Sequence, residues 1–189
     1  MFNFDSTLID SSNIKLWMDS NNWGGVLKNL HQTSLYPAVK EMLDELYKLD
    51  IEYAIVSSAP KGYIERALKH HKLNFNYIVG QHDVSMQKPS SEGLGKCHSH
   101  FNLEANECVY IGDSDIDYLT AKSAGCKFFG VEWGIFNEQK VPKISYRNIG
   151  EDVLGLIDTS LESNEVNSDF IVNKGNHFCL GYIMLTNYV

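Results

Sequence analysis

The sequence is poor in the features that mark membrane and secreted proteins. No apolar run approaches the roughly 18 residues that a membrane span needs. The first five residues, MFNFD, include no basic region and open no long apolar stretch, so we expect no secretory signal. The 4 cysteines form no Cys-x-x-Cys pair, which is typical of reduced thiols rather than a disulfide or zinc framework. We therefore expect a cytoplasmic protein.

Positive charge is also scarce. The chain has 16 Lys and Arg against 24 Asp and Glu, which gives a formal net charge of −8 at pH 7. Nucleic acids and anionic membranes require a basic face, so we expect neither as a partner. The acidity is otherwise consistent with simple solubility. Hydrophobic residues make up 43% of the 189 residues, enough for one domain with a sizeable core.

The sequence does contain a regular alternation of two patterns. Short apolar runs alternate with segments in which apolar residues recur every three or four positions, as in a parallel sheet flanked by helices. We expect strands at 1–4, 51–56, 77–79, 108–111 and 127–131, and helices at 37–49, 61–71, 92–100, 116–124 and 153–157. The pattern predicts an α/β fold over residues 1–157, with a doubly wound (Rossmann-like), mainly parallel sheet and helices on both faces.

Two segments lie outside this alternation. Residues 158–169 are polar and acidic, which is typical of a linker. Residues 170–189 are apolar and rich in aromatic side chains, and 173–176 could turn a hairpin. Such an apolar segment promotes aggregation when exposed. We expect this extension to be buried as a strand pair, or to bind a protein partner or a second copy of the chain.

Polar side chains follow the predicted strands where ligands bind in doubly wound sheets, beyond the carboxyl ends. These candidates are Asn3 and Asp5, Ser57 and Ser58, Lys88, and Asp113, Asp115 and Asp117. Carboxylates that would repel one another suggest a bound hard cation such as Mg²⁺. Hydroxyls and a lysine suit a phosphate group brought to that metal. The sequence therefore predicts a site for a phosphorylated ligand at this edge.

Four segments in order resemble the motifs of the haloacid dehalogenase superfamily. The sequence FNFDSTLIDS at 2–11 is similar to the first motif, usually Asp-x-Asp-Gly-Thr-Leu. The sequence IVSS at 55–58 resembles the second motif, Lys88-Pro89 the third, and GDSDID at 112–117 the fourth. Each segment falls at the expected element boundary, and the resemblance extends over residues 1–157.

The resemblance implies a magnesium-dependent phosphatase. In that family the first carboxylate attacks phosphorus, a second carboxylate two residues later is the general acid and base, and Mg²⁺ shields the negative charges. Carried over, the roles are Asn3 at the nucleophile position, Asp5 as general acid/base, Ser57, Ser58 and Lys88 on phosphate, and Asn3, Asp5, Asp113 and Asp117 on the metal. Asp5 would bind the metal through its main-chain carbonyl, and Asp117 would support either Lys88 or the metal.

The chain departs from the family pattern at its nucleophile. Asn3 stands where the family has aspartate, and an amide is a poor, uncharged nucleophile. Two interpretations follow: a phosphatase disabled at one residue, or a non-catalytic domain that binds a phosphorylated ligand or regulates a partner. Deamidation to aspartate is disfavoured because the bulky Phe4 follows. Ser6 replaces the usual glycine, a milder change because serine occurs in turns.

The segment that selects substrates in this family is short here. Residues 12–36 form the insertion after the first motif, too few for a full helical cap domain. Trp17 and Trp23 lie in it, either packing a short helix on the core or roofing the site. Such a minimal cap would leave the site nearly open to a large phosphorylated substrate, or to closure by another subunit.

Overall fold

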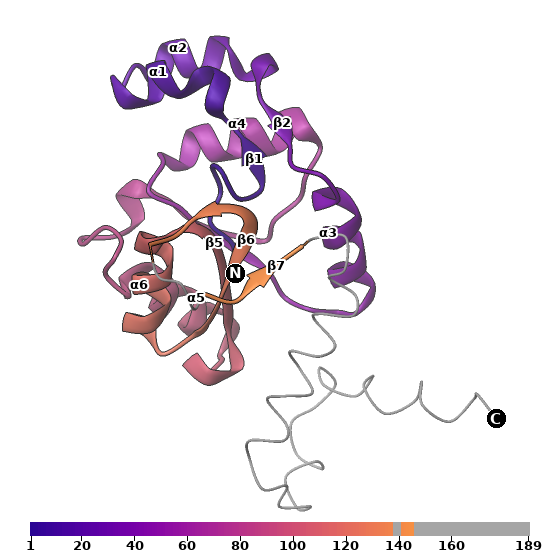
Figure 1. Ribbon diagram of the computed structural model, residues 1–189, viewed down its shortest axis with the longest axis vertical. Helices are drawn as coiled ribbons and strands as arrows, with labels where there is room; N and C mark the ends of the chain where they lie inside the picture. Colours follow the sequence, from indigo (N-terminus) through magenta and orange to yellow (C-terminus); the bar gives the residue numbers. More distant parts are fainter. Residues whose placement is uncertain (138–140, 146–189) are drawn as a thin grey trace, which may run out of the picture.

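The computed structural model describes residues 1–137 and 141–145, and its centre is a parallel sheet (Figure 1). The paired strands are β3 (Ala54–Val56), β4 (Tyr77–Val79), β5 (Val109–Ser114), β6 (Lys127–Ile135) and β7 (Lys143–Ile144). β3 pairs with β4, β5 with β6 and β6 with β7, all in parallel. Phe2 joins the two groups through parallel bridges to Ile55 and Ile111. The order β4–β3–Phe2–β5–β6–β7 confirms the expected α/β class.

The start of the chain occupies the centre of this sheet. The Phe2 N–H donates to the Ala54 carbonyl at 2.9 Å, and the Val56 N–H donates to the Phe2 carbonyl at 2.9 Å. On the other side, the Asn3 N–H donates to the Ile111 carbonyl at 2.8 Å. Asn3 is therefore held between β3 and β5.

Helices cover both faces of the sheet. One core cluster joins Phe2, Ile55 and Ile111 to buried residues of α3 (Val39–Lys48) and α4 (Lys61–His71). A second joins Ala54, Val56 and Tyr110 to buried residues of α5 (Glu92–Phe101) and α6 (Asp115–Ala124). Neighbouring strand residues point to opposite faces, so β3, β4, β5 and β6 each contribute to both clusters.

A short helical segment extends from the first motif. It begins at β1 (Ile9–Asp10), which pairs in antiparallel fashion with β2 (Ser34–Leu35). Between these strands lie α1 (Lys15–Asp19) and α2 (Trp23–Lys28), which Figure 1 shows at one end of the molecule, beyond α4. Trp17 packs so closely on Gly25 that a larger side chain at 25 would clash with its ring.

Several strand boundaries differ from the predicted ones. β3 begins at Ala54 rather than 51, and β5 runs from Val109 to Ser114 rather than over 108–111. The strand expected at 1–4 is reduced to the bridge at Phe2, because the Phe4 carbonyl already accepts from Leu8 N–H at 2.9 Å in a turn. β6 runs to Ile135 because that residue pairs with Ser114 beyond an irregularity in β5.

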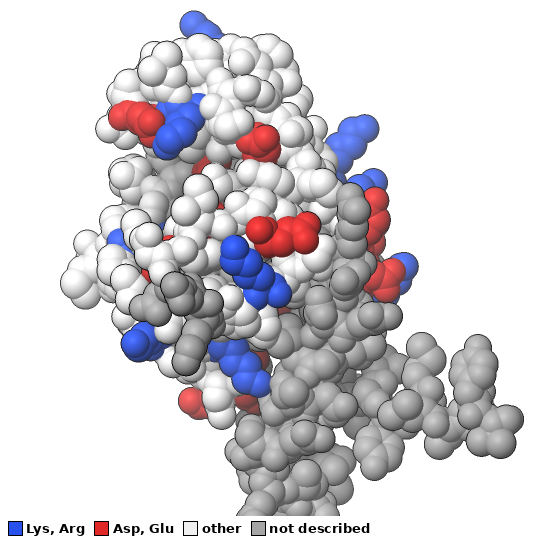
Figure 2. Space-filling model, viewed as in Figure 1, with Lys and Arg blue, Asp and Glu red and all other residues white. Residues whose placement is uncertain are grey.

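The predicted helix 153–157, linker 158–169 and extension 170–189 lie outside the described residues. Among the residues that are described, no helix is both long and apolar enough to cross a membrane. On the face drawn in Figure 2, acidic and basic side chains are interspersed among uncharged ones. Exposed ion pairs such as Lys15–Asp19, at 3.0 Å, contribute little stability.

Candidate functional site

Side chains from three motifs meet at the carboxyl edge of the sheet. Lys88 Nζ donates to Asn3 Oδ1 at 2.9 Å and to Asp117 Oδ1 at 2.7 Å. Asn3 Nδ2 donates to Asp113 Oδ1 at 2.7 Å. Asn3 follows the bridge at Phe2, Asp113 lies near the end of β5, and Asp117 is in the first turn of α6. Four of the expected site residues thus form one network.

The Lys88–Asp117 ion pair is buried, with side-chain exposures of 10% and 2%. The Asp117 carboxylate also accepts from Ser114 Oγ at 2.9 Å and from the Asp113 N–H at 3.3 Å. Protein donors therefore use both of its oxygens. Of the two roles expected for Asp117, these contacts favour support of Lys88 over metal binding.

Tyr110 completes this buried cluster, and sequence reasoning missed it. Lys88 Nζ donates to Tyr110 Oη at 3.1 Å, and Tyr110 Oη lies 2.9 Å from the Val56 carbonyl and 3.1 Å from Asp117 Oδ1. Burial and the neighbouring Asp117 raise the pKa of Tyr110 well above its ordinary value, so the phenol stays protonated. Tyr110 thus helps to hold the Lys88 ammonium group in place.

Asp5 receives a hydrogen bond from a second tyrosine that sequence reasoning missed. Tyr63 Oη, on α4, donates to Asp5 Oδ1 at 2.6 Å. The Tyr63 ring contacts Phe4 and Trp23, with centroid distances of 5.8 and 5.6 Å. Burial raises the pKa of Asp5 from 3.8, and the Tyr63 hydrogen bond opposes that rise. Tyr63 thus joins the general acid/base candidate to Trp23 of the helical segment.

The first motif is also held from β6. Ser6 has φ 58°, in the left-handed region where glycine is at ease, which gives a physical reason for the family's glycine at this position. Trp133 Nε1 donates to the Ser6 carbonyl at 2.9 Å. The Trp133 ring stacks on Tyr36 with centroids 4.3 Å apart. Trp133 thus connects β6 to the turn that follows Asp5.

The phosphate-binding candidates of the second motif lie at the end of β3. Ser57 is buried and its Oγ accepts from the Ala59 N–H at 3.1 Å, whereas Ser58 is exposed. Val56, one residue earlier, is bonded to Phe2. Ser57 therefore stands at the same sheet edge as Asn3. In the described part of the chain, no hydrogen bond connects either serine to the Lys88 network.

Asp113 carries a carboxylate in a polar but poorly solvated position. It accepts from Asn3 Nδ2 at 2.7 Å and from Thr7 Oγ1 at 2.8 Å through the same oxygen, Oδ1. Burial raises its pKa from 3.8, as does the nearby Asp117, while the two hydrogen bonds lower it. The net direction is upward, so the folded state binds this proton more tightly than the unfolded chain.

The raised pKa of Asp113 predicts that the free energy of unfolding depends on pH. For a carboxylate with a raised folded pKa, stability present at low pH is lost as pH rises from the unfolded value through the folded pKa. Urea unfolding in a chelating buffer should therefore show that Asp113→Asn gains stability relative to the unchanged chain as the pH rises above the ordinary carboxyl value of 3.8. Parallel pH profiles for the two chains would contradict the assignment.

The Mg²⁺ expected from the resemblance does not fit these side chains as they stand. Asn3 Nδ2 donates to the main-chain carbonyl of Asp5 at 3.0 Å as well as to Asp113. An N–H group therefore faces the two oxygens expected to bind the metal, and cations bind oxygen lone pairs. Within 1–137 and 141–145, no group of three or more His, Cys, Asp or Glu side chains is arranged to hold a metal ion.

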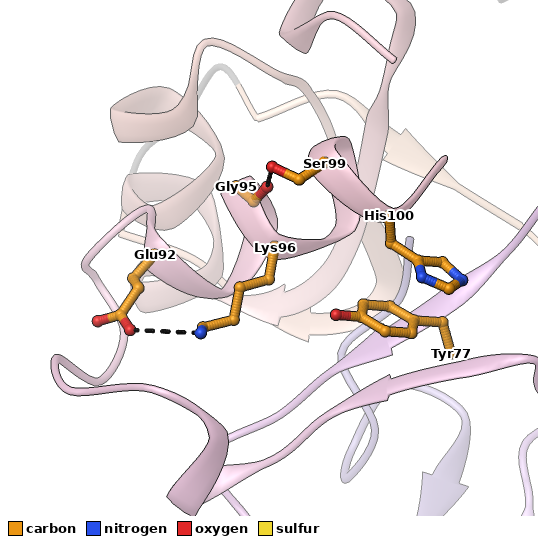
Figure 3. A pocket seen from close by; sticks show the side chains of 6 residues that line it. All are labelled: Tyr77, Glu92, Gly95, Lys96, Ser99 and His100. Atoms are coloured by element: carbon orange, nitrogen blue, oxygen red, sulfur yellow. Dashed lines mark hydrogen bonds and ion pairs between the residues drawn. The ribbon is translucent and has the colours of Figure 1, made fainter. Parts of the chain in front are cut away.

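A hollow of about 670 Å³ elsewhere on the molecule offers no competing site (Figure 3). It lies along α5 and the start of β4. Its charged residues, Glu92 and Lys96, pair with each other at 3.9 Å. Two of its rings, Tyr77 and His100, stack with centroids 3.8 Å apart. None of the expected site residues lines it.

Comparison with protein families identifies a hydrolase family. A family model described as "Haloacid dehalogenase-like hydrolase" matches residues 17–131, more than half of the 189-residue chain. The matched range includes Ser57, Lys88 and Asp113, whereas Asn3 and Asp5 precede it. The placement of those two residues in the site therefore rests on the geometry above.

Similar curated proteins share an activity in their names. A "Phosphoglycolate phosphatase" of Vibrio parahaemolyticus is 35% identical over 107 residues, which cover 55% of this chain and 47% of that protein. One of Vibrio vulnificus is 28% identical over 131 residues, covering 68% of this chain and 58% of that protein. The chain thus spans about half the length of these relatives.

Solved structures share the fold. A putative haloacid dehalogenase-like hydrolase from Bacteroides fragilis has a TM-score of 0.63 and 25% identity, covering 76% of this chain and 92% of that one. A putative phosphoglycolate phosphatase from Lactobacillus plantarum has a TM-score of 0.69 at 19% identity, covering 82% and 97%. The second likeness, at its low identity, concerns the fold alone.

Proposed function

Because the chain belongs to the haloacid dehalogenase-like hydrolase family, we propose that it is a phosphatase-type domain for a phosphomonoester, with hydrolysis suppressed by Asn3. One observation carries this proposal: Lys88 Nζ contacts Asn3 Oδ1 at 2.9 Å. A buried ammonium group thus meets the side chain at the nucleophile position. Its place is where a phosphoryl oxygen would need a positive partner.

The surrounding groups support the division of roles that the resemblance implies. Asp5, with a raised pKa and a hydrogen bond from Tyr63, is suited to give a proton to a leaving oxygen and later to take one from water. Lys88 and Ser57 would hold the phosphoryl oxygens. The requirement for Mg²⁺ belongs to this proposal only with a carboxylate at residue 3, where the metal would offset negative charge.

The substrate class follows from the relatives and from the helical segment. The Vibrio proteins are named for phosphoglycolate, so 2-phosphoglycolate is the first substrate to test. The segment between β1 and β2 contributes Trp23, whose ring contacts Tyr63 beside Asp5. We propose that residues 12–36 are a minimal cap that reaches the acid/base group through this pair of rings.

A second function rests on the amide itself. Asn3 is buried, and both ends of its amide are hydrogen-bonded, its oxygen to Lys88 and its nitrogen to Asp113. A site so satisfied without a nucleophile would suit a domain that binds a phosphorylated ligand without turnover. Failure of a restored carboxylate to give hydrolysis would favour this second function.

The role of Lys88 is tested in a chain that carries Asn3→Asp. Adding Lys88→Met should lower kcat/KM for 2-phosphoglycolate by about 10²-fold or more, because a charge-assisted contact to a buried phosphoryl group is lost. Lys61→Met, which removes an exposed lysine 3.9 Å from Asp83, is the matched control and should leave the rate unchanged.

Lys88→Met also leaves the buried Asp117 carboxylate without its positively charged partner, which costs about 3–5 kcal/mol for a buried pair. Circular dichroism shows whether each variant is folded. A triple variant with Asn3→Asp, Lys88→Met and Asp117→Asn removes the unpaired carboxylate, so a loss of activity that remains in it reflects lost phosphate binding. Full activity in a folded Lys88→Met chain would contradict the assignment.

A further inference from the structure

The direction of the Asn3 amide is set by a residue far along the chain. An amide has one acceptor oxygen and one donor nitrogen, so each end suits a different partner. Lys88 Nζ has only hydrogens to offer, and it donates to the Asn3 oxygen at 2.9 Å. The Asn3 nitrogen must therefore point away from Lys88.

The nitrogen end meets oxygen atoms only. Asn3 Nδ2 donates to Asp113 Oδ1 at 2.7 Å and to the Asp5 carbonyl at 3.0 Å, with Thr7 Oγ1 at 3.3 Å. The first two are the oxygens expected to bind Mg²⁺. The two N–H hydrogens of the amide thus point at these two oxygens, on the side from which a cation would bind them.

We propose that the Asn3 amide takes the place of the divalent cation in the ligand-free chain, so that this chain binds Mg²⁺ poorly. This inference rests on the proposed function in one respect, namely that the family resemblance defines where the metal would bind. An aspartate at residue 3 has two acceptor oxygens, one for Lys88 and one for a cation. Asparagine has a single acceptor oxygen, which faces the positive charge of Lys88.

Turning the amide over does not restore the metal position. A half-turn would bring its N–H groups against the ammonium of Lys88 and its oxygen against the carboxylate of Asp113. Both new contacts are repulsive, and Lys88 is fixed by Asp117 at 2.7 Å and Tyr110 at 3.1 Å. Mg²⁺ binding therefore has to break the amide contacts first.

Titration calorimetry with Mg²⁺, in the absence of any phosphoester, tests this inference. Asn3→Asp should bind Mg²⁺ at least about tenfold more tightly than the unchanged chain, a factor common for groups that set metal ligands. Asn3→Ala should also bind more tightly than the unchanged chain, because it frees Asp113 and the Asp5 carbonyl. Asp19→Asn, an exposed carboxylate of α1, is the control for nonspecific cation binding.

The alanine variant separates obstruction by the amide from simple loss of a ligand. Weaker Mg²⁺ binding by Asn3→Ala than by the unchanged chain would overturn the inference, as would equal binding by the unchanged chain and Asn3→Asp. If thermal unfolding shows that Asn3→Ala is not folded, Asn3→Ser makes the same comparison. Lack of hydrolysis by Asn3→Asp with the predicted metal pattern would overturn only the proposed phosphatase.

Discussion

Replacing Asn3 by aspartate is expected to raise the Mg²⁺-dependent hydrolysis of 2-phosphoglycolate by at least ~10³-fold over the unchanged chain, which is about 4 kcal/mol of barrier. The change is isosteric and supplies a charged oxygen to attack phosphorus. It also removes the N–H groups that face Asp113 and the Asp5 carbonyl. Nucleophile and cation position are therefore restored by one substitution.

The measurement is release of inorganic phosphate by the two purified chains, with Mg²⁺ and with a chelator. Asn3→Ala is the control, because it opens the metal position without adding a nucleophile and should stay inactive. Hydrolysis by the unchanged chain at the rate of Asn3→Asp would contradict the assigned role of residue 3. Inactivity of both would favour the ligand-binding function.

In the Asn3→Asp chain, the further change Asp5→Asn is expected to lower kcat by about 10²–10⁴-fold, the usual contribution of a general acid/base. Asp5 Oδ1 accepts a hydrogen bond from the Tyr63 hydroxyl at 2.6 Å, and an asparagine oxygen can still accept it. The loss should therefore reflect proton transfer rather than a displaced side chain.

Substrates with different leaving groups make this prediction specific. The phenolate of an aryl phosphate with an acidic phenol leaves without needing a proton. Transfer of its phosphoryl group to residue 3 should therefore be slowed less by Asp5→Asn than transfer from 2-phosphoglycolate. Asp10→Asn is the control, since Asp10 bonds the exposed Ser12 N–H at 3.0 Å. If Asp5→Asn lowers the rate of phosphorylation of residue 3 equally for both substrates, Asp5 is not the general acid.

The regular part of the fold could be predicted because its signals are local. The helix predicted at 61–71 has the same bounds as α4, and four of its residues, Tyr63, Ile64, Ala67 and Leu68, are buried at helical spacing. The length of the first strand could not be predicted, because the strand ends at a turn in which the Phe4 carbonyl accepts a hydrogen bond from the Leu8 N–H. That turn is fixed by packing rather than by composition.

The sequence places the candidate site residues at one edge of the sheet, but it does not give the hydrogen-bond network between them. Tyr63 lies on the buried side of a helix and Tyr110 within an apolar strand, so both look like ordinary core residues in the sequence. Their hydroxyl partners, Asp5 and Lys88, appear only when distant elements pack. The orientation of the Asn3 amide likewise depends on a lysine 85 positions away.

The most direct test of the account is to look for a phosphoryl group on residue 3. The Asn3→Asp chain is mixed with phosphoester and Mg²⁺, quenched rapidly in acid, and mapped by peptide mass spectrometry. We expect an acid-stable phosphoryl group on residue 3, much slower labelling when Lys88→Met is added, and none when residue 3 is asparagine. Phosphate release by Asn3→Asp with residue 3 never labelled would contradict the account.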